Sequence, residues 1–444
     1  MHGYGPSAST RRRPRPPARP GWLAVAAIGC TLGLVATACS GGGGAGADHP
    51  AAVSIVPADG STGANPIQGI TVRVARGKLR RVTVTTSGEP VSGKLNAART
   101  VWRSTNPTLN VSQSYTVTAK ATGASGQAVT RTSTFRTLTP SQTFTTKIEE
   151  GAGLTYGVGM PIILYFNQHI TNKAAVERAL QVKTSTPIVG SWYWDDSCGF
   201  APTCVYFRPQ TYWPAHTRVS FTGHLNGVEG APGVYGEHTL SQSFTIGDSL
   251  IVVASTVTHH MDLYRNGKLF ARWPISTGRP GDDTANGTYL TLDKGNPVVM
   301  VGPGYSLSVP WSVRFTWSGS FLHDAYWSVG VQGWANVSHG CVNMPPADAE
   351  IYYKMEHPGD PVTITGSPRA GVFDNGWTMW FMPWSKYLQG SALGAAVEAG
   401  PSGSTFVNPW SVPGGSTFVG PWSVPGATAT APLGAPSPGN SAAS

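Results

Sequence analysis

Short runs in which apolar and polar residues alternate fill the first part of this chain. Between residues 51 and 140, segments 70–74 and 115–119 show the period of two that places apolar side chains on one face of a strand. Glycines such as Gly123 and Gly126 separate the runs, as turn residues do in all-β domains. The pattern predicts a β-sandwich over residues 51–140.

The next section, residues 141–247, repeats this plan loosely. Each of the two sections closes on a strand-like segment that ends in phenylalanine, at Phe135 and at Phe244. A helical pattern near residues 174–180 interrupts the second section. We therefore expect a mainly β protein that begins with two tandem immunoglobulin-like β-sandwich domains.

A third region, residues 248–368, has a different order of elements. It opens on the apolar run 250–253, and Asn266-Gly267 then lies between alternating apolar residues, which is a strong hairpin signal. Pro346 stands where a short helix to residue 355 would begin, and residues 361–364 form a further strand pattern. These patterns predict a small, mostly antiparallel β-domain with short helices.

Composition and charge narrow the class of protein. Charged residues make up 12% of the 444 residues, against roughly 25% in average soluble domains, which favours a secreted β-rich protein. The formal charge is +9, but five arginines between residues 11 and 19 supply +5 of it and leave +4 for the rest. The sequence also lacks an aromatic-plus-basic module, so we expect no nucleic-acid partner.

Residues 1–39 have the layout of an export signal. An arginine-rich start precedes the apolar run 22–36, and A-T-A-C ends at Cys39 in the manner of a bacterial lipobox. Glycines follow from residue 41, so residues 40–50 would be a flexible tether. We expect a lipid anchor on Cys39 and a protein on the outer face of the cytoplasmic membrane. An ordinary signal peptide or an uncleaved signal anchor is the alternative.

Two further cysteines suit a disulfide. Cys198 and Cys204 are separated by five residues in an exported protein, a spacing typical of a small closed loop. A redox-active pair is the alternative, but the spacing is not C-x-x-C. Pairing of these residues and lipid on Cys39 would leave Cys341 as a free thiol in the mature chain.

Cys341 has neighbours that suit nucleophilic chemistry. It lies in the turn S-H-G-C-V-N, and His323 stands eighteen positions upstream. A thiol at its ordinary pKa of about 8.5 needs an imidazole to take its proton, and we assign His323 as that base. Backbone N–H groups at Gly340 and Cys341 would stabilise an oxyanion. A lone cysteine is otherwise often a small buried apolar residue.

These residues carry a resemblance to a known family. A histidine, a spacer and S/T-H-G-C-x-N resemble the catalytic signature of the YkuD-type L,D-transpeptidases, of the mycobacterial lipoprotein type with Ig-like domains ahead of the catalytic domain. The resemblance covers residues 248–368. It extends through these positions: Thr277, Gly278, Thr284, Ala285, Asn286, Gly287, Tyr305, Ser318, Gly319, Ser338, His339 and Asn343.

The resemblance also implies roles for single residues. The third member of the catalytic triad would be Asp324, acting through its backbone carbonyl, where relatives usually carry serine. Its carboxylate would also hold the imidazolium. Tyr305 would be a lid over the substrate and could help to hold the oxyanion. The implied substrate contacts are Tyr305, Ser318, Gly319, Ser338, His339 and Asn343.

The implied reaction is cell-wall crosslinking. Cys341 would attack the third residue of a peptidoglycan tetrapeptide stem, release the terminal D-alanine and pass the acyl group to an acceptor stem as a 3→3 crosslink. Carbapenem-type inhibitors would acylate the same thiol. The alternatives are an L,D-carboxypeptidase that uses the same site and a non-catalytic peptidoglycan-binding lipoprotein.

We expect no cofactor and no metal. His259 and His260 could suggest zinc ligation with the other histidines, but no spacing here matches a known zinc site. A start of the helix at Pro346, shortly after Cys341, would place a helix dipole near the thiol and favour a thiolate.

The chain ends in two segments of unusual composition. Residues 369–390 are rich in large aromatic side chains, among them Trp377, Trp380, Phe381 and Trp384, which we expect to pack on a neighbouring domain. Residues 391–444 are rich in Gly, Pro and Ser and contain a duplicated twelve-residue segment, so we expect a disordered tail.

Overall fold

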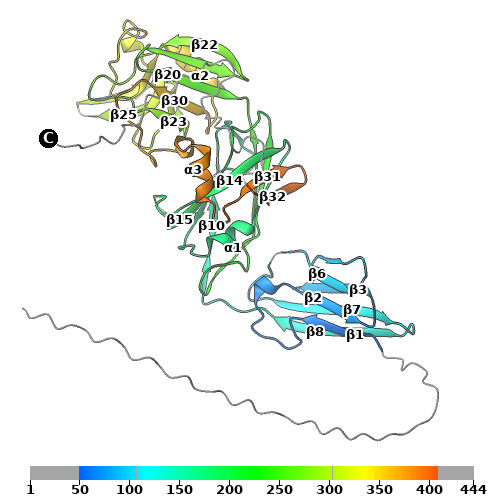
Figure 1. Cartoon of the computed structure of the whole chain (residues 1–444). Coiled ribbons are helices and arrows are strands. Elements are labelled where there is room, and N and C mark those ends of the chain that lie inside the picture. The colour runs from blue at the N-terminus through cyan, green and yellow to red at the C-terminus, as the bar shows by residue number, and fades with distance from the viewer. Residues whose placement is uncertain (1–49, 107, 200, 303, 409–444) are drawn as a thin grey trace, which may run out of the picture. The chain divides into compact units, whose positions relative to one another are not determined.

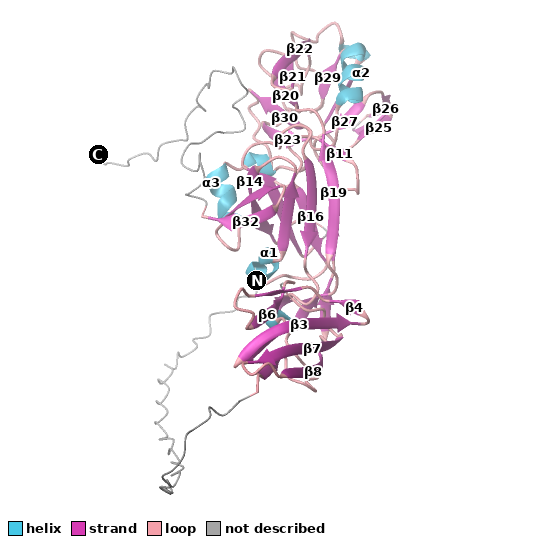
Figure 2. Cartoon of the chain, turned by 90° about the vertical axis from the view of Figure 1, so that its right-hand side faces the viewer, coloured by secondary structure: helices cyan, strands magenta, loops and turns pink. Residues whose placement is uncertain are grey.

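The protein is described from a computed structural model that covers residues 50–408 apart from 107, 200 and 303. The expected leader, Cys39, and nearly all of the expected tether lie outside these residues, as does the chain from residue 409 onward. Strands dominate the described chain (Figures 1 and 2), as the sequence pattern predicts. No helix between residues 50 and 408 is both long and apolar enough to cross a bilayer.

The first module is a sandwich of two four-stranded sheets, as predicted. Alternation in β7 (Ser114–Gly123) buries Tyr115, Val117, Ala119 and Ala121 between the sheets. One sheet has the order β1 (Ala52–Val56), β2 (Thr71–Ala75), β6 (Val101–Ser104), β5 (Gly93–Leu95). The other has the order β4 (Glu89–Pro90), β3 (Gly77–Thr86), β7 (Ser114–Gly123), β8 (Ala128–Arg136).

The second module is a larger sandwich. Its six-stranded sheet has the order β10 (Thr146–Ile148), β12 (Ile162–Phe166), β15 (Thr203–Pro209), β14 (Ile188–Asp195), β31 (Ala396–Gly400), β32 (Gly403–Val407). The four-stranded sheet has the order β11 (Thr155–Tyr156), β19 (Leu240–Ile246), β16 (Arg218–Gly223), β13 (Leu180–Thr184). A small sheet contains β17 (Glu229–Ala231), β18 (Val234–Gly236), β9 (Gln142–Phe144).

Two local predictions for this module are confirmed. The helix expected near residues 174–180 is α1 (Lys173–Arg178). Cys198 and Cys204 form a disulfide with Cα atoms 6.2 Å apart. The bridge closes the loop between β14 and β15, which are paired with each other. Of the cysteines in the described chain, Cys341 is the free one.

The third domain is built on two sheets. The larger has the order β22 (Lys268–Pro274), β21 (His260–Arg265), β20 (Leu250–Ser255), β30 (Pro361–Thr365), β23 (Gly287–Leu290). The other has the order β24 (Lys294–Gly295), β27 (Ser312–Arg314), β28 (Phe321–Asp324), β29 (Val342–Met344). A separate hairpin pairs β25 (Val298–Gly302) with β26 (Tyr305–Val309), and α2 covers Pro346–Met355.

Turn chemistry sets the hairpin between β21 and β22. Asn266 and Gly267 both have positive φ angles, of 48° and 77°. A two-residue turn with this geometry requires positive φ at both positions, and Asn-Gly adopts it at low cost. The hairpin predicted from the sequence is therefore confirmed.

The aromatic extension packs on the second module, as predicted. Trp377 and Trp380 are buried within the apolar cluster of that module, and Trp380 Nε1 donates to Gly159 O over 2.8 Å. The guanidinium of the buried Arg208 lies 4.2 Å from the Trp380 ring centroid and donates to Met382 O. The extension ends in the short helix α3 (Trp384–Tyr387). It therefore contributes to the core of the second module, whose Gly159 lies 221 positions before Trp380 in the sequence.

The predicted start of the disordered tail at residue 391 is wrong. Residues 396–407 form β31 and β32, and β31 pairs antiparallel with β14. Val397 and Ala399 are buried. Composition indicated disorder because Gly, Ser and Pro prevail, but the open edge of β14 supplies hydrogen-bond partners that composition does not reveal.

Candidate active site

Cys341 directly precedes β29, and its thiol lies beside the start of β28. Its Sγ donates to the backbone carbonyl of Gly319 over 3.9 Å, and the N–H of Phe321 also interacts with it. Phe321 and His323 are two positions apart in the same strand, so their side chains project from the same face. β28 pairs in parallel with β29, and this register places His323 opposite Asn343, two residues after Cys341. Strand pairing therefore brings the predicted nucleophile and base to one end of this sheet.

His323 is fixed by a hydrogen bond to its own strand. Its Nδ1 lies 2.7 Å from the backbone carbonyl O of Asp324. A carbonyl oxygen only accepts, so Nδ1 carries the proton and Nε2 carries the free lone pair. The imidazole is buried, and Trp327 stacks on it with ring centroids 5.8 Å apart. Burial lowers the pKa of His323 to about 4, so the ring is a neutral base.

Burial also decides the charge of the thiol. It raises the pKa of Cys341 to about 11, against a smaller lowering effect of the Phe321 N–H. The helix dipole expected to favour a thiolate does not reach the sulfur, because β29 separates Cys341 from the start of α2. Three extended residues correspond to roughly 10 Å of strand. At neutral pH the site thus holds a neutral thiol and a neutral imidazole.

Asp324 contacts His323 through its backbone carbonyl, which is the contact that the resemblance implies. Its carboxylate accepts from the backbone N–H of Tyr326 over 3.0 Å. Burial raises the pKa of this carboxyl, and the hydrogen bond from Tyr326 opposes the rise. The contact observed for the carboxylate is thus with Tyr326, whereas the contact with His323 is made by the carbonyl. The expected support of the imidazolium by the carboxylate is not among the contacts in this structure.

Ser338 makes two hydrogen bonds across the turn that leads into Cys341. Ser338 Oγ donates to Cys341 O over 2.7 Å and accepts from Gly340 N over 3.1 Å. Thr284 Oγ1 donates to Gly340 O over 3.0 Å. Gly340 has a φ of 114°, which favours glycine. The N–H of Gly340, which we expected in an oxyanion hole, is therefore engaged by Ser338 in this state.

Asn343 is positioned by protein partners. It is buried, and its Nδ2 donates to Ser328 Oγ over 3.0 Å. Its backbone forms an isolated bridge with Ser276. These contacts fix the segment after Cys341. They also occupy the Asn343 side chain, which the resemblance implies as a substrate contact.

Tyr305 and His339 lie together at the surface. Tyr305 begins β26 of the separate hairpin and is 38% exposed, and its ring centroid lies 5.3 Å from that of His339. The ring also covers Gly302, where a Cβ atom would come within 2.3 Å of it. Contact with the residue two positions before Cys341 places Tyr305 beside the catalytic turn, where a lid would lie.

Ser318 and Gly319 lie on the other side of the thiol. The carbonyl of Gly319 is the acceptor for Cys341 Sγ. Ser318 is held by Asn375, since Asn375 Nδ2 donates to Ser318 Oγ over 2.9 Å and Asn375 Oδ1 accepts from Ser318 N over 2.9 Å. Asn375 belongs to the aromatic extension and had no signal in the sequence, because its partner lies 57 positions away.

Asn336 is a second residue that sequence reasoning missed. Its Oδ1 accepts from the N–H and the hydroxyl of Thr277 over 3.1 and 2.8 Å, and its Nδ2 donates to Thr256 O over 2.8 Å. Nδ1 of His259 lies 2.9 Å from Asn336 Oδ1. His259 thus ties down the loop that leads into S-H-G-C.

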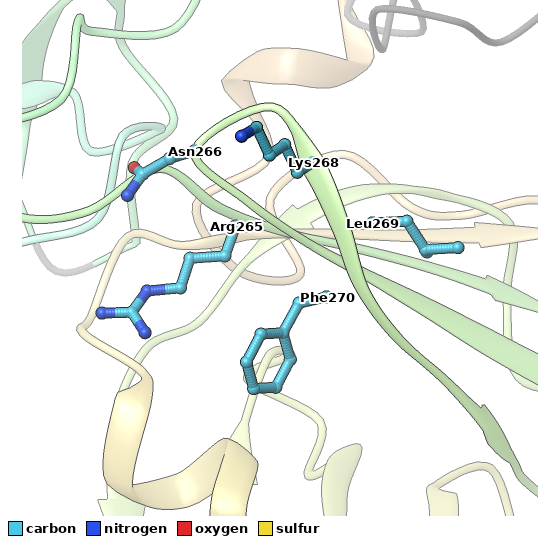
Figure 3. A pocket seen from close by; sticks show the side chains of 5 residues that line it. All are labelled: Arg265, Asn266, Lys268, Leu269 and Phe270. Carbon is cyan, nitrogen blue, oxygen red and sulfur yellow. The ribbon is translucent and has the colours of Figure 1, made fainter.

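Two other features lie apart from this cluster. Between residues 50 and 408, no group of three or more His, Cys, Asp or Glu side chains is arranged to hold a metal ion. A shallow hollow at the hairpin of β21 and β22 is lined by Arg265, Asn266, Lys268, Leu269 and Phe270 (Figure 3). Arg265 there pairs with Asp248 over 2.6 Å. None of these five residues belongs to the predicted site.

Comparison with protein families matches both parts of the chain. The L,D-transpeptidase catalytic domain family matches residues 249–364, and the bacterial Ig domain family matches residues 61–229. L,D-transpeptidase 2 of Mycobacterium tuberculosis (strain CDC 1551 / Oshkosh) is 32% identical over 75% of this chain and 83% of its own length. L,D-transpeptidase 5 of strain H37Rv is 34% identical over 76% of each chain.

Solved structures give similar matches in sequence. An L,D-transpeptidase in complex with imipenem is 33% identical and covers 51% of this chain and 100% of its own, with a TM-score of 0.42. L,D-transpeptidase 3 from Mycobacterium tuberculosis, in complex with a faropenem-derived adduct, is 30% identical over 50% of this chain and 97% of its own, with a TM-score of 0.40.

Proposed function

Because the chain belongs to the L,D-transpeptidase family, we propose that it forms 3→3 crosslinks in peptidoglycan through a thioester on Cys341. The sulfur attacks the carbonyl carbon of the third residue of a tetrapeptide stem, and the bond to the terminal D-alanine breaks. The side-chain amine of a second stem then attacks the thioester. This forms the crosslink and returns the thiol.

The observation that carries this proposal is the tautomer of His323. With Nδ1 donating to Asp324 O, Nε2 is free to take the thiol proton as the sulfur attacks. The resulting imidazolium gives that proton to the departing amine of D-alanine. In the second half-reaction Nε2 takes a proton from the acceptor amine, and the thiolate leaving group regains one. A base kept neutral by burial can perform both transfers at neutral pH.

The hydrogen-bond donors for the oxyanion are the less complete part of the site. Gly340 N donates to Ser338 Oγ, so its use as an oxyanion donor requires Ser338 to rotate away. The N–H of Cys341 and the Tyr305 hydroxyl are the other donors that we assign, the latter after the hairpin of β25 and β26 closes over substrate. Ser318, Gly319, Ser338, His339 and Asn343 contact or position the bound stem.

The same site would react with carbapenems. Opening of the lactam by Cys341 would leave a thioester without expelling a separate leaving group. Relatives have been solved with imipenem and with a faropenem-derived adduct. We also propose that Cys39 carries a lipid and that the enzyme works on the outer face of the cytoplasmic membrane, which fits substrates in the cell wall.

Incubation with a disaccharide-tetrapeptide tests the reaction. We expect free D-alanine and a crosslinked dimer from the wild-type protein and neither from Cys341→Ala. Release of D-alanine with a tripeptide product and no dimer would instead identify an L,D-carboxypeptidase. Binding of the muropeptide without any release, where a related transpeptidase is active, would support a non-catalytic binding protein.

A further inference from the structure

The last strand of the described chain belongs to a sequence that the protein repeats. Residues 403–414 read G-S-T-F-V-N-P-W-S-V-P-G and residues 415–426 read G-S-T-F-V-G-P-W-S-V-P-G. β32 takes up the first five residues of the first copy. Those five residues are identical in the second copy, and the two copies differ only at Asn408 and Gly420.

β32 occupies a site between two edge strands of the second module. It pairs antiparallel with β31, from Ala396 opposite Val407 to Gly400 opposite Gly403. Ser404 Oγ accepts from the backbone N–H of Val182 in β13 over 3.1 Å. Since β13 is the last strand of the four-stranded sheet, β32 covers part of one edge in each sheet.

The site makes three specific demands on its occupant. Gly403 has a φ of 117°, and a Cβ atom there would lie 3.0 Å from Gln181 Nε2, so glycine is favoured. The second residue must present a hydroxyl to Val182. The fifth residue, Val407, packs on the small cluster that contains Leu388 and Ala396. The second copy meets all three demands, with Gly415, Ser416 and Val419.

We propose that residues 415–419 are a second occupant of the β32 site, so that the C-terminal segment docks in either of two registers twelve residues apart. The contacts made by the five strand residues are the same in both registers. The registers differ in the length of the connection from β31, which is residues 401–402 for the first copy and residues 401–414 for the second. Loop-closure entropy then favours the first copy roughly 20-fold.

Exchange between the two registers would change which copy of the repeat is available for binding. In the second register, residues 401–414 form a loop, and both sheet edges remain covered. The first copy, including its half-exposed Phe406, becomes available to another partner without uncovering Val397 and Ala399 in the core. A strand from a second molecule would compete poorly, because a tethered strand in the same chain has a high effective concentration.

Proline substitutions test whether the second copy can replace the first. Phe406→Pro with Val407→Pro removes two adjacent strand N–H donors from the first copy. Phe418→Pro with Val419→Pro is the matched control in the second copy, and a four-proline variant disables both. We expect unchanged stability for the control. The first-copy variant should lose up to about 20-fold in the unfolding equilibrium, and the four-proline variant should lose at least tenfold more. If the first-copy and four-proline variants are equally stable, the second copy does not dock and the proposal fails.

A disulfide trap reports the register directly. Glu398 lies opposite Thr405, and both are exposed. In a Cys341→Ala background, Glu398→Cys is combined with Thr405→Cys for the first register or with Thr417→Cys for the second. The second pair should crosslink in a minor fraction of molecules, and in most of them once residues 406 and 407 are proline. Absence of that intrachain crosslink in the proline variant, or crosslinking only between molecules, would overturn the proposal.

Discussion

Nδ1 of His323 lies 2.7 Å from the backbone carbonyl oxygen of Asp324, the next residue in the same strand. This contact orients the base without using the side chain of residue 324, whose carboxylate instead accepts from Tyr326 N. The chemistry at position 323 should therefore be insensitive to the identity of its neighbour.

Substitution at Asp324 tests this relationship. We expect Asp324→Asn and Asp324→Ser to keep kcat/KM for D-alanine release within about threefold of wild type, because the carbonyl remains. The substitutions also change the hydrogen bond to Tyr326, and loss of that bond would lower kcat/KM by at most about fivefold, which corresponds to about 1 kcal/mol. His323→Gln serves as the inactive control. A loss of a hundredfold or more in Asp324→Asn would show that the carboxylate acts on the imidazole.

The charge state of the resting thiol gives a second prediction. Burial raises the pKa of Cys341 to about 11, so the thiolate appears only as the pH rises toward that value and is scarce at pH 7. Thiolate absorbance near 240 nm, taken as the difference between wild type and Cys341→Ala, should stay flat through pH 8 and rise above it. Alkylation by iodoacetamide at pH 8 should be at least tenfold slower than that of a free cysteine. A titration midpoint below pH 7 would instead indicate a resting thiolate and imidazolium pair.

Thr284 should be needed to hold the catalytic turn. Its hydroxyl accepts from Gly278 N over 2.9 Å and donates to Gly340 O. Thr284→Val keeps the volume but leaves these buried groups unpaired, at a cost of about 1–3 kcal/mol. We expect acylation to slow by roughly 10- to 100-fold. Thr284→Ser keeps the hydroxyl and should stay near wild type, and equal rates for the valine and serine variants would dismiss the role.

Trp380 should stabilise the second module although it follows the catalytic domain in sequence. It is buried, stacks with Arg208 and donates to Gly159 O. Trp380→Ala should cost about 3–5 kcal/mol in the free energy of unfolding. Trp334, which is 83% exposed, provides a control whose alanine variant should change it by less than about 0.5 kcal/mol. Chemical denaturation measures both, and similar values for the two variants would show that Trp380 does not pack in the core of the second module.

The catalytic pair could be predicted from sequence because its chemistry is local. Cys341 and His323 stand eighteen positions apart, His323 in β28 and Cys341 directly before β29, the strand paired with β28, so a short motif contains most of the information. Asn375 and Asn336 could not be found in this way, since each bonds to residues more than fifty positions away. Ordinary asparagines in loops give no sign of such partners.

The same limit explains the error at the C-terminus. Residues 396–407 look like a linker by composition, and their strand character depends on the edge of β14, about two hundred positions earlier. The neutral state of the thiol could not be predicted from the sequence for a related reason. A sequence shows the neighbours of Cys341 in the chain, but the pKa responds to burial by residues brought in from elsewhere.

Intact-mass analysis after an acid quench shows whether Cys341 forms the thioester. During turnover of a disaccharide-tetrapeptide, we expect wild-type protein to carry an added mass equal to the substrate minus D-alanine, located by peptide mapping on Cys341. Cys341→Ala should carry no adduct and release no D-alanine. Release of D-alanine at the wild-type rate by Cys341→Ala, or an adduct mapped to any other residue, would show that Cys341 is not the nucleophile.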